Sequence, residues 1–140
     1  MNQPIPQGKY QPAIRHQDIV YTSGMTSRVQ GVLMYTGKIQ ISKPIETYFQ
    51  AVRLAAKNAL LAAQAVLHEY EKISMILQLS VYLNAEQGFN EHSKIADFAS
   101  AFLMEELGIS IVGSRIAIGV ATLPSNAPVE ISLVASISRS

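Results

Sequence analysis

The chain contains no cysteine and no tryptophan, and charged side chains make up only 15% of its 140 residues. The lack of cysteine excludes disulfides, thiolate nucleophiles, iron–sulfur clusters and thiolate zinc sites. Lysine and arginine together number 11, against 10 aspartates and glutamates. No run of like charge occurs, so the clustered cations of a nucleic-acid-binding surface are missing. We therefore expect no nucleic-acid partner.

Long apolar runs and nucleotide-binding motifs are also missing. No stretch approaches the roughly 18 uninterrupted apolar residues of a membrane span. The opening MNQPIPQGKY lacks the apolar segment of a secretory signal. His16, His68 and His92 have no second ligand at a metal-binding spacing, and no glycine-rich phosphate loop occurs. We expect a cytoplasmic protein that has no membrane partner and binds no metal.

Apolar residues, by contrast, are abundant and make up 49% of the chain. A length of 140 residues is the usual size of one domain, so we expect a single domain over 1–140. Few charged side chains are available to cover so much apolar surface. This imbalance favours an oligomer.

The spacing of the apolar residues predicts two helices. From about 46–70 they recur at steps of three and four, which is typical of a long amphipathic helix, here rich in alanine. A second stripe over about 90–107 predicts another helix, and Gly108 is a suitable C-terminal stop.

Alternating apolar and polar residues predict the strands. We expect a strand pair over 13–15 and 19–23, a short strand over 32–35, and a half-buried strand over 76–83 with Leu77 on its apolar side. Two more strands lie on either side of a turn in the last third of the chain. The order β-β-(β)-α-β-α-β-β predicts an α+β fold, a mainly antiparallel sheet with both helices packed on one face.

We expect the last two strands to form a hairpin around a turn at 124–127. In the first of them the bulky Ile116 and Ile118 are predicted to face the helices, which leaves Arg115 on the uncovered face. The alternation of the second strand puts Glu130 on the uncovered face as well. The small and polar residues predicted for that face are Ala117, Gly119, Ala121, Ser132 and Ser136.

Several short segments, taken in order along the chain, resemble those of one known family. The segments are Gly8-Lys9-Tyr10, Tyr21-Thr22-Ser23-Gly24, Arg115-Ile116-Ala117, Leu123-Pro124 and Val129-Glu130-Ile131. Together with the order of the elements, they make the chain similar to the reactive-intermediate deaminase (Rid, or YjgF) family over nearly its whole length. The resemblance implies a chorismate mutase-like homotrimer that uses no cofactor and hydrolyses 2-imino acids to 2-keto acids and ammonia.

The same resemblance implies roles for particular residues. Arg115 would hold the carboxylate of a 2-imino acid, and Glu130 would handle the proton of the attacking water. The further residues that it implies for the site are Tyr10, Ser23, Gly24, Ala117 and Ser93, the last at a position where the well-studied deaminases usually have asparagine. Both main roles also make chemical sense. A guanidinium grips a carboxylate bidentately, and a carboxyl group beside a bound water can first take and later give a proton.

Two other functions stay open. A trimer could hold a small carboxylate in the same clefts without turnover, as a binding or regulatory protein, and the departure at Ser93 favours this alternative. A third function, endoribonuclease or translation inhibitor, is attached to some members of the family and gains no support from the charge balance of this chain.

The expected hairpin also predicts how the site is assembled. In it, Arg115 and Glu130 lie six residues apart along the ladder, which is about 20 Å at roughly 3.3 Å per residue. One small imino acid cannot span that distance. We therefore predict that each site joins Arg115 of one subunit to Glu130 of its neighbour in a homotrimer.

Overall fold

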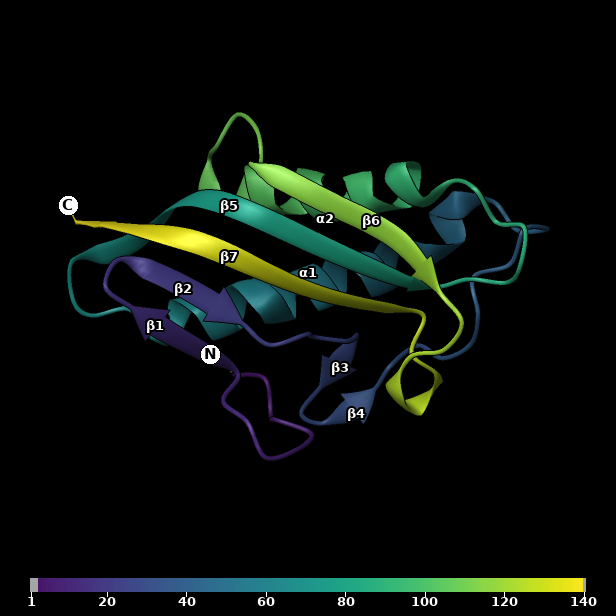
Figure 1. Ribbon diagram of the computed structural model, residues 1–140, viewed down its shortest axis with the longest axis horizontal. Coiled ribbons are helices and arrows are strands. Elements are labelled where there is room, and N and C mark those ends of the chain that lie inside the picture. Colours follow the sequence, from purple (N-terminus) through teal and green to yellow (C-terminus); the bar gives the residue numbers. More distant parts are fainter. Residues whose placement is uncertain (1–2, 140) are drawn as a thin grey trace.

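Five strands form the central sheet, and two helices cover one of its faces (Figure 1). The computed structural model describes residues 3–139. In chain order the elements are β1 (Ala13–His16), β2 (Ile19–Thr22), β3 (Arg28–Val29), β4 (Val32–Leu33), a 3₁₀ helix η1 (Ile45–Tyr48), α1 (Phe49–Gln64), β5 (Glu71–Asn84), α2 (His92–Leu107), β6 (Ser114–Val120), a 3₁₀ helix η2 (Pro124–Asn126) and β7 (Val129–Arg139). The sheet has the order β1-β2-β7-β5-β6, and β3 and β4 form a separate small hairpin. This confirms the predicted α+β fold.

The hydrophobic core fills the space between the sheet and the two helices. α1 packs against β7 and β2, and α2 packs against β5 and β6. Alanine lets α1 lie close to the sheet, because a methyl side chain leaves little distance between the backbones. The buried alanines of α1 are Ala51, Ala55, Ala56, Ala59, Ala62 and Ala63. No helix in the described part of the chain is long and apolar enough to cross a membrane.

Both predicted helices are present, but the first has different ends. α1 is shorter than the expected 46–70, since a 3₁₀ turn precedes it and it stops at Gln64. The chain then turns back to the sheet, where the guanidinium of Arg15 holds Glu71 at the start of β5. α2 ends as predicted, at Gly108, whose φ of 64° is the left-handed conformation that glycine adopts easily.

β5 is longer than expected, and its pairing is irregular. It spans Glu71–Asn84 instead of 76–83, and its pairing with β7 shifts register twice. The second shift lies between Ile76 and Gln78. It turns Ile76 into the core and moves Leu77 to a partly exposed position, so the predicted side of Leu77 was wrong.

The last two strands do not form a hairpin with each other. β6 pairs in parallel with one edge of β5, and β7 pairs antiparallel with the other edge. α2 carries the chain back along the sheet between β5 and β6, so β6 runs in the same direction as β5. The turn at 124–127 therefore leads past the end of β5, and the hairpin prediction was wrong (Figure 1).

The two faces of β6 are also the reverse of the prediction. Arg115 pairs with the buried Leu79, so its side chain points to the helix-covered face. Ile116 and Ile118 point to the open face, where they are 39% and 44% exposed. The reason is that β6 is the edge strand beneath α2. The small Ala117 fits under the helix there, and a long arginine can reach round the edge towards water.

β7 keeps the predicted alternation. Ile131 and Leu133 are buried under the helices, while Glu130 and Ser132 lie on the open face. Because β6 has the reverse of its predicted orientation while β7 keeps the predicted one, Arg115 and Glu130 lie on opposite faces of one sheet.

Candidate functional site

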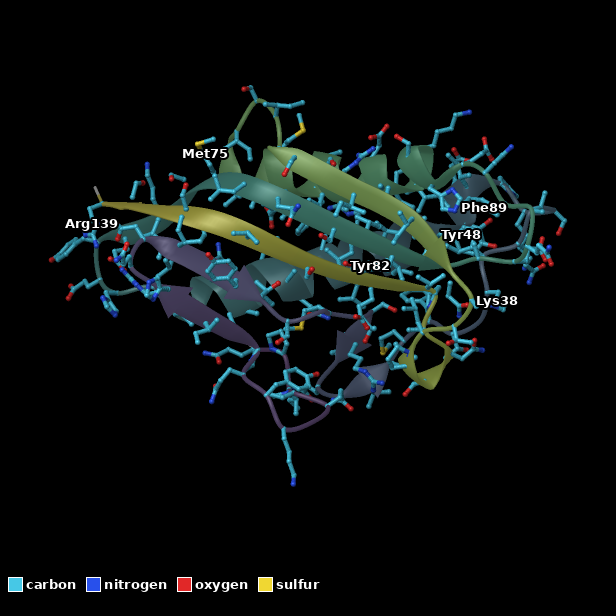
Figure 2. The ribbon with its side chains drawn as sticks, viewed as in Figure 1. Lys38, Tyr48, Met75, Tyr82, Phe89 and Arg139 are labelled. Carbon is cyan, nitrogen blue, oxygen red and sulfur yellow. The ribbon has the colours of Figure 1, made fainter. Side chains whose placement is uncertain are left out.

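Glu130 lies on the open face of β7 and pairs with Tyr82 of β5. Tyr82 is labelled in Figure 2. The Glu130 side chain is partly buried, and within residues 3–139 its carboxylate has no hydrogen-bond or ion-pair partner. Burial disfavours the charged form, so it raises the pKa of the Glu130 carboxyl group above its usual value. A glutamate with a raised pKa is suited to accept a proton and return it at a pH near neutral.

Gly24 provides the space in which this carboxyl group lies. A Cβ at position 24 would come within 2.7 Å of Cδ of Glu130, closer than two such carbon atoms can pack. The segment is fixed beside β7 by its neighbour Met25, whose backbone exchanges hydrogen bonds of 2.7 and 2.8 Å with that of Ile131. The pairing of Met25 therefore sets the position of Gly24 against the carboxyl group.

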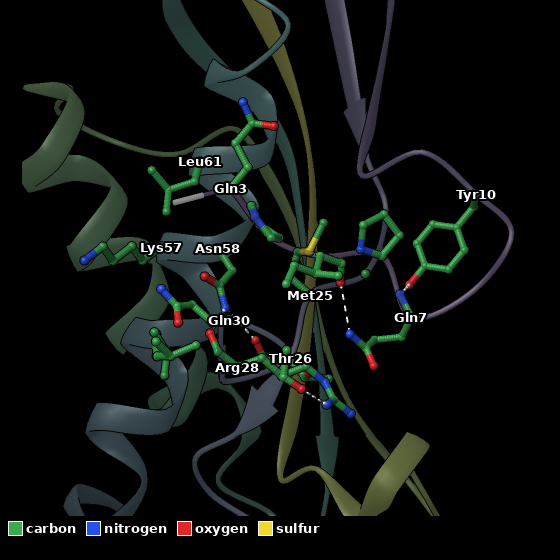
Figure 3. Close-up of a pocket in the computed structure, with 17 residues that line it drawn as sticks. Gln3, Gln7, Tyr10, Met25, Thr26, Arg28, Gln30, Lys57, Asn58 and Leu61 are labelled. Carbon is green, nitrogen blue, oxygen red and sulfur yellow. Dashed lines mark hydrogen bonds between the residues drawn. The ribbon is translucent and has the colours of Figure 1, made fainter. Parts of the chain in front are cut away.

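Ser23 and Tyr10 lie next to the same segment. The Ser23 hydroxyl donates a 2.6 Å hydrogen bond to the backbone carbonyl of Gln11, so it ties the loop to the N-terminal arm. Tyr10 is 47% exposed, and its phenol oxygen accepts a hydrogen bond from the backbone N–H of Gln7. Tyr10 and Gly24 line one cavity (Figure 3). The structure thus gathers four predicted residues around one end of β7.

Arg115 belongs to a second group, on the helix-covered face. Its Nη1 donates to Oδ1 of Asp97 at 2.7 Å and to Oγ of Ser100 at 3.1 Å. Its Nη2 donates to Oγ of Ser93 at 2.8 Å, which brings these two predicted residues together. The guanidinium therefore links β6 to one face of α2, with Asp97 as its counter-ion.

Ala117 lies on the same face of β6 as Arg115 and packs against the core. Further along the strand, His92 covers Gly119, and a Cβ at that glycine would lie 2.6 Å from Nε2 of the imidazole. His92 also meets the ring of Phe89 edge-on, with the centroids 5.0 Å apart. The N-terminal end of α2 therefore closes over β6.

The two groups are far apart within one chain. Leu79 of β5 pairs with Arg115, whereas Tyr82, three residues on, pairs with Glu130. Two strand spacings across and three residues along put the two Cα atoms about 14 Å apart, before the opposite orientation of the side chains is counted. One chain cannot bring both side chains onto one small molecule. As predicted, the two side chains of one chain do not meet, but the predicted spacing of about 20 Å along one face of a hairpin was wrong, because the residues lie on opposite faces of non-adjacent strands.

Sequence reasoning missed Asp97 and Ser100 as partners of Arg115. A signal was available, because Ser93, Asp97 and Ser100 recur at i, i+4 and i+7, the spacing of one helix face. Within residues 3–139 no three histidine, aspartate or glutamate side chains come together in a way that could hold a metal ion.

Comparison with known proteins gives consistent matches over almost the whole chain. A family model described as "YjgF/chorismate mutase-like, putative endoribonuclease" matches residues 4–137. A crystal structure from Shewanella oneidensis MR-1, described as a "putative endoribonuclease", is 29% identical with a TM-score of 0.85 and covers 97% of this chain and 90% of its own. The crystal structure of Atu1372 of Agrobacterium tumefaciens, a protein of unknown function, is 26% identical with a TM-score of 0.85. The match covers 99% of this chain and 87% of Atu1372. Protein TCP17 of Trypanosoma cruzi is 28% identical over 125 residues, which are 84% of this chain and 78% of that protein.

Proposed function

Because this chain belongs to the YjgF/chorismate mutase-like family, we propose that it is an enamine/imine deaminase, which hydrolyses reactive 2-imino acids to 2-keto acids and ammonia without a cofactor. The observation that carries the proposal is the Glu130 carboxyl group, which is partly buried, unpaired within residues 3–139, and has a raised pKa. An ionisable group kept without a partner costs stability, and such groups cluster at functional sites.

Glu130 would act first as a base and then as an acid. Its carboxylate takes a proton from water as the water oxygen bonds to the carbon of the protonated imine, C=NH2+, which gives a neutral carbinolamine. The protonated carboxyl group then returns that proton to the nitrogen. As the C–N bond breaks and ammonia leaves, the C=O bond of the 2-keto acid forms and the hydroxyl proton passes to the Glu130 carboxylate, which releases it to solvent. General acid–base help of this kind is worth roughly 10²–10⁴ in rate.

Arg115 would hold the carboxylate of the substrate. Its planar guanidinium can bind both carboxylate oxygens at once, and an arginine is charged at any relevant pH. The side chain is 20% exposed at the edge strand, so an anion can reach it from outside the chain. The exposed carboxylate of Asp97 would give way to the carboxylate of the substrate.

The site would be completed by a second subunit of a homotrimer. This part of the proposal is supported by the opposite orientations of Arg115 and Glu130, since only a neighbouring chain can bring such residues together. It is supported also by the open face, where Ile116 and Ile118 are exposed on the edge strand beside Tyr82. Exposed apolar side chains on an unpaired edge favour burial between subunits.

A second candidate function is a trimeric protein that binds or senses small carboxylates without turnover. It is favoured by the four hydrogen bonds of Arg115 to Ser93, Asp97 and Ser100, which would suit a structural clamp as well as an anchor. In that case ligand binding would persist in the absence of hydrolysis.

One experiment distinguishes the two candidates. 2-Imino acids are generated in situ with an amino-acid oxidase or a threonine dehydratase, and release of ammonia and 2-keto acid is followed with and without the protein. Acceleration that depends on Glu130 supports the deaminase. Saturable binding of the 2-keto acid without acceleration supports the binding protein.

A further inference from the structure

A cavity of about 320 Å³ lies between the N-terminal arm and α1. Tyr10 and Gly24 of the candidate site line its edge, but neither Glu130 nor Arg115 does. Its walls come from three parts of the chain, the arm over 3–10, the segment 24–31, and one face of α1 (Figure 3). Asn58 of α1 and Gln7 of the arm lie on opposite sides of Met25 in this view. A volume of this size can hold a small organic molecule.

The polar centre of the cavity is Asn58, which is only 8% exposed. Its amide nitrogen donates to the backbone carbonyls of Thr26 at 2.9 Å and Arg28 at 2.8 Å. Both of its donor hydrogens are therefore used, and these two carbonyls decide which amide atom is the oxygen.

The amide oxygen of Asn58, in contrast, receives no hydrogen bond within residues 3–139. This oxygen is not fully buried either. In the described part of the chain, the fully buried side-chain polar atoms without a hydrogen-bond partner are Oγ of Ser27 and Nε of Arg28, and Oδ1 of Asn58 is not one of them. Oδ1 of Asn58 therefore has some exposed surface, and because Asn58 lines the cavity we infer that this acceptor faces it. Such an atom favours a ligand with an N–H or O–H group, because a ligand without a donor would cover this acceptor and leave it unpaired.

The charges around the cavity limit the ligand further. Within residues 3–139 no aspartate or glutamate lines it, so a cationic ligand would find no counter-ion. The guanidinium of Arg28 is directed to the carbonyl of Gly31 and the hydroxyl of Ser125. The ammonium group of Lys57 points away from Met25 (Figure 3). Both cations line the cavity, but an anion placed at Asn58 would face the amide oxygen, another acceptor, which is unfavourable.

The rest of the wall is uncharged and largely apolar. Leu54 and Leu61 of α1, one turn to either side of Asn58, and Ile5 of the arm provide apolar surface. We propose that this cavity binds a small uncharged molecule with an apolar body and a primary carboxamide, whose N–H donates to Oδ1 of Asn58. Gln3 and Gln7 of the arm also line the cavity.

Four probes of one shape test the proposal by NMR titration of the full-length protein. They are isovaleramide, the ketone 4-methyl-2-pentanone, isovalerate and isoamylamine. Isovaleramide should give saturable shifts of the backbone N–H signals of Thr26 and Gly31. The other three should bind at least about tenfold more weakly, because each lacks an uncharged N–H donor. The absence of saturable binding by isovaleramide, or equal binding by the ketone, would overturn the proposal.

Variants of the apolar wall locate the binding. Leu61→Phe fills the cavity without touching the hydrogen bonds of Asn58, and it should abolish the isovaleramide shifts. Leu67→Phe, a matched change outside the cavity, should leave them unchanged. Leu54→Phe replaces Leu61→Phe if the latter does not fold. Undiminished binding in a folded cavity variant would place the ligand elsewhere and refute the assignment, whatever the outcome of the imine assay.

Discussion

The carboxyl group of Glu130 packs directly against Gly24, so that any side chain at position 24 would have to displace it. The φ of Gly24 is not in the left-handed region, so alanine fits the backbone there. Gly24→Ala should therefore keep the fold but move the proposed base. We expect kcat for 2-imino acid hydrolysis to fall by about 10–100-fold, as a small displacement of a catalytic group can do.

The control for this variant is Gly119→Ala. Its new Cβ would press on the flexible imidazole of His92 instead of a proposed catalytic group. Activity close to wild type in Gly119→Ala and a large loss in Gly24→Ala, both with unchanged circular dichroism, is the expected pair. Equal activities in the two would remove the support for Glu130.

Substitutions of Arg115 and of its partner can distinguish a residue that binds substrate from one that only links β6 to α2. Arg115→Ala removes the proposed carboxylate anchor and should abolish activity. It should also lower the free energy of unfolding by about 1 kcal/mol, because it removes the link between β6 and α2. Arg115→Lys should not restore activity, since it lacks the bidentate fork.

Asp97→Asn is the matched change on the other side of this ion pair. It frees the guanidinium from its carboxylate partner, so an anchoring Arg115 should bind substrate better and KM should fall. A purely structural Arg115 predicts that KM stays constant and only the thermal unfolding temperature changes. Steady-state kinetics and thermal unfolding of the same sample decide between the two.

The raised pKa of Glu130 predicts a pH dependence. The ionised form is needed as base, so kcat/KM should decline as pH falls through the raised pKa, at a higher pH than an ordinary glutamate would give. Glu130→Gln should lose kcat more than binding and abolish this limb of the profile.

Glu130→Gln should lower activity, but it should leave the stability of the fold equal or higher. A folded-state pKa above the unfolded value means that the ionised carboxylate destabilises the fold above that pKa, and that this cost disappears at lower pH. Glu130→Gln should therefore unfold at an equal or higher temperature than wild type at neutral pH. A clear loss of stability there would show that Glu130 has a structural partner.

Glu71 predicts acid sensitivity of the fold. Its side chain is 4% exposed and pairs with Arg15 at 2.5 Å and with Arg139 at 3.2 Å. The hydrogen bonds from Arg15 lower the pKa of Glu71 from 4.5 to about 2. Because this folded-state pKa is depressed, the contribution of Glu71 is present above about 4.5 and is lost as pH falls towards about 2.

Glu71→Gln should therefore lower the unfolding temperature by several degrees at neutral pH, and the difference from wild type should shrink across that acidic window. Glu69→Gln is the control, because Glu69 is exposed two residues away. Thermal unfolding followed by circular dichroism between pH 2 and pH 7 measures both. A difference that does not depend on pH would contradict the role of the ion pair.

The shared site predicts complementation between inactive variants. Arg115→Ala and Glu130→Gln trimers, unfolded and refolded together, should regain part of the activity, because some interfaces then receive both intact residues. Light scattering should give the mass of a trimer, and mass spectrometry should detect mixed trimers. Mixed trimers without activity would rule out a site shared between Arg115 and Glu130.

Local features were predictable from the sequence. The stripes of α1 and α2, the stop at Gly108 and the alternation of β7 each depend on residues close together in the chain. The same holds for Arg115 and Glu130 as candidates, since short segments with the pattern of a known family surround both. Their chemistry could be named before their positions were known.

The positions of the two side chains depend on contacts between distant segments. The crossover through α2 made β6 parallel to β5, and the pairing of Leu79 with Arg115 then turned the arginine towards the helices. Alternation alone gives two faces but does not say which one the helices cover, so the sequence left that choice open for β6. The cavity around Asn58 could not be predicted either, because the arm, the segment 24–31 and α1 meet only in the folded chain. The sequence by itself determined the elements, through local periodicity, and the reactive residues, through short local segments. The tertiary structure alone decided which of those residues meet, since strand pairing and helix packing join parts of the chain that local patterns cannot relate.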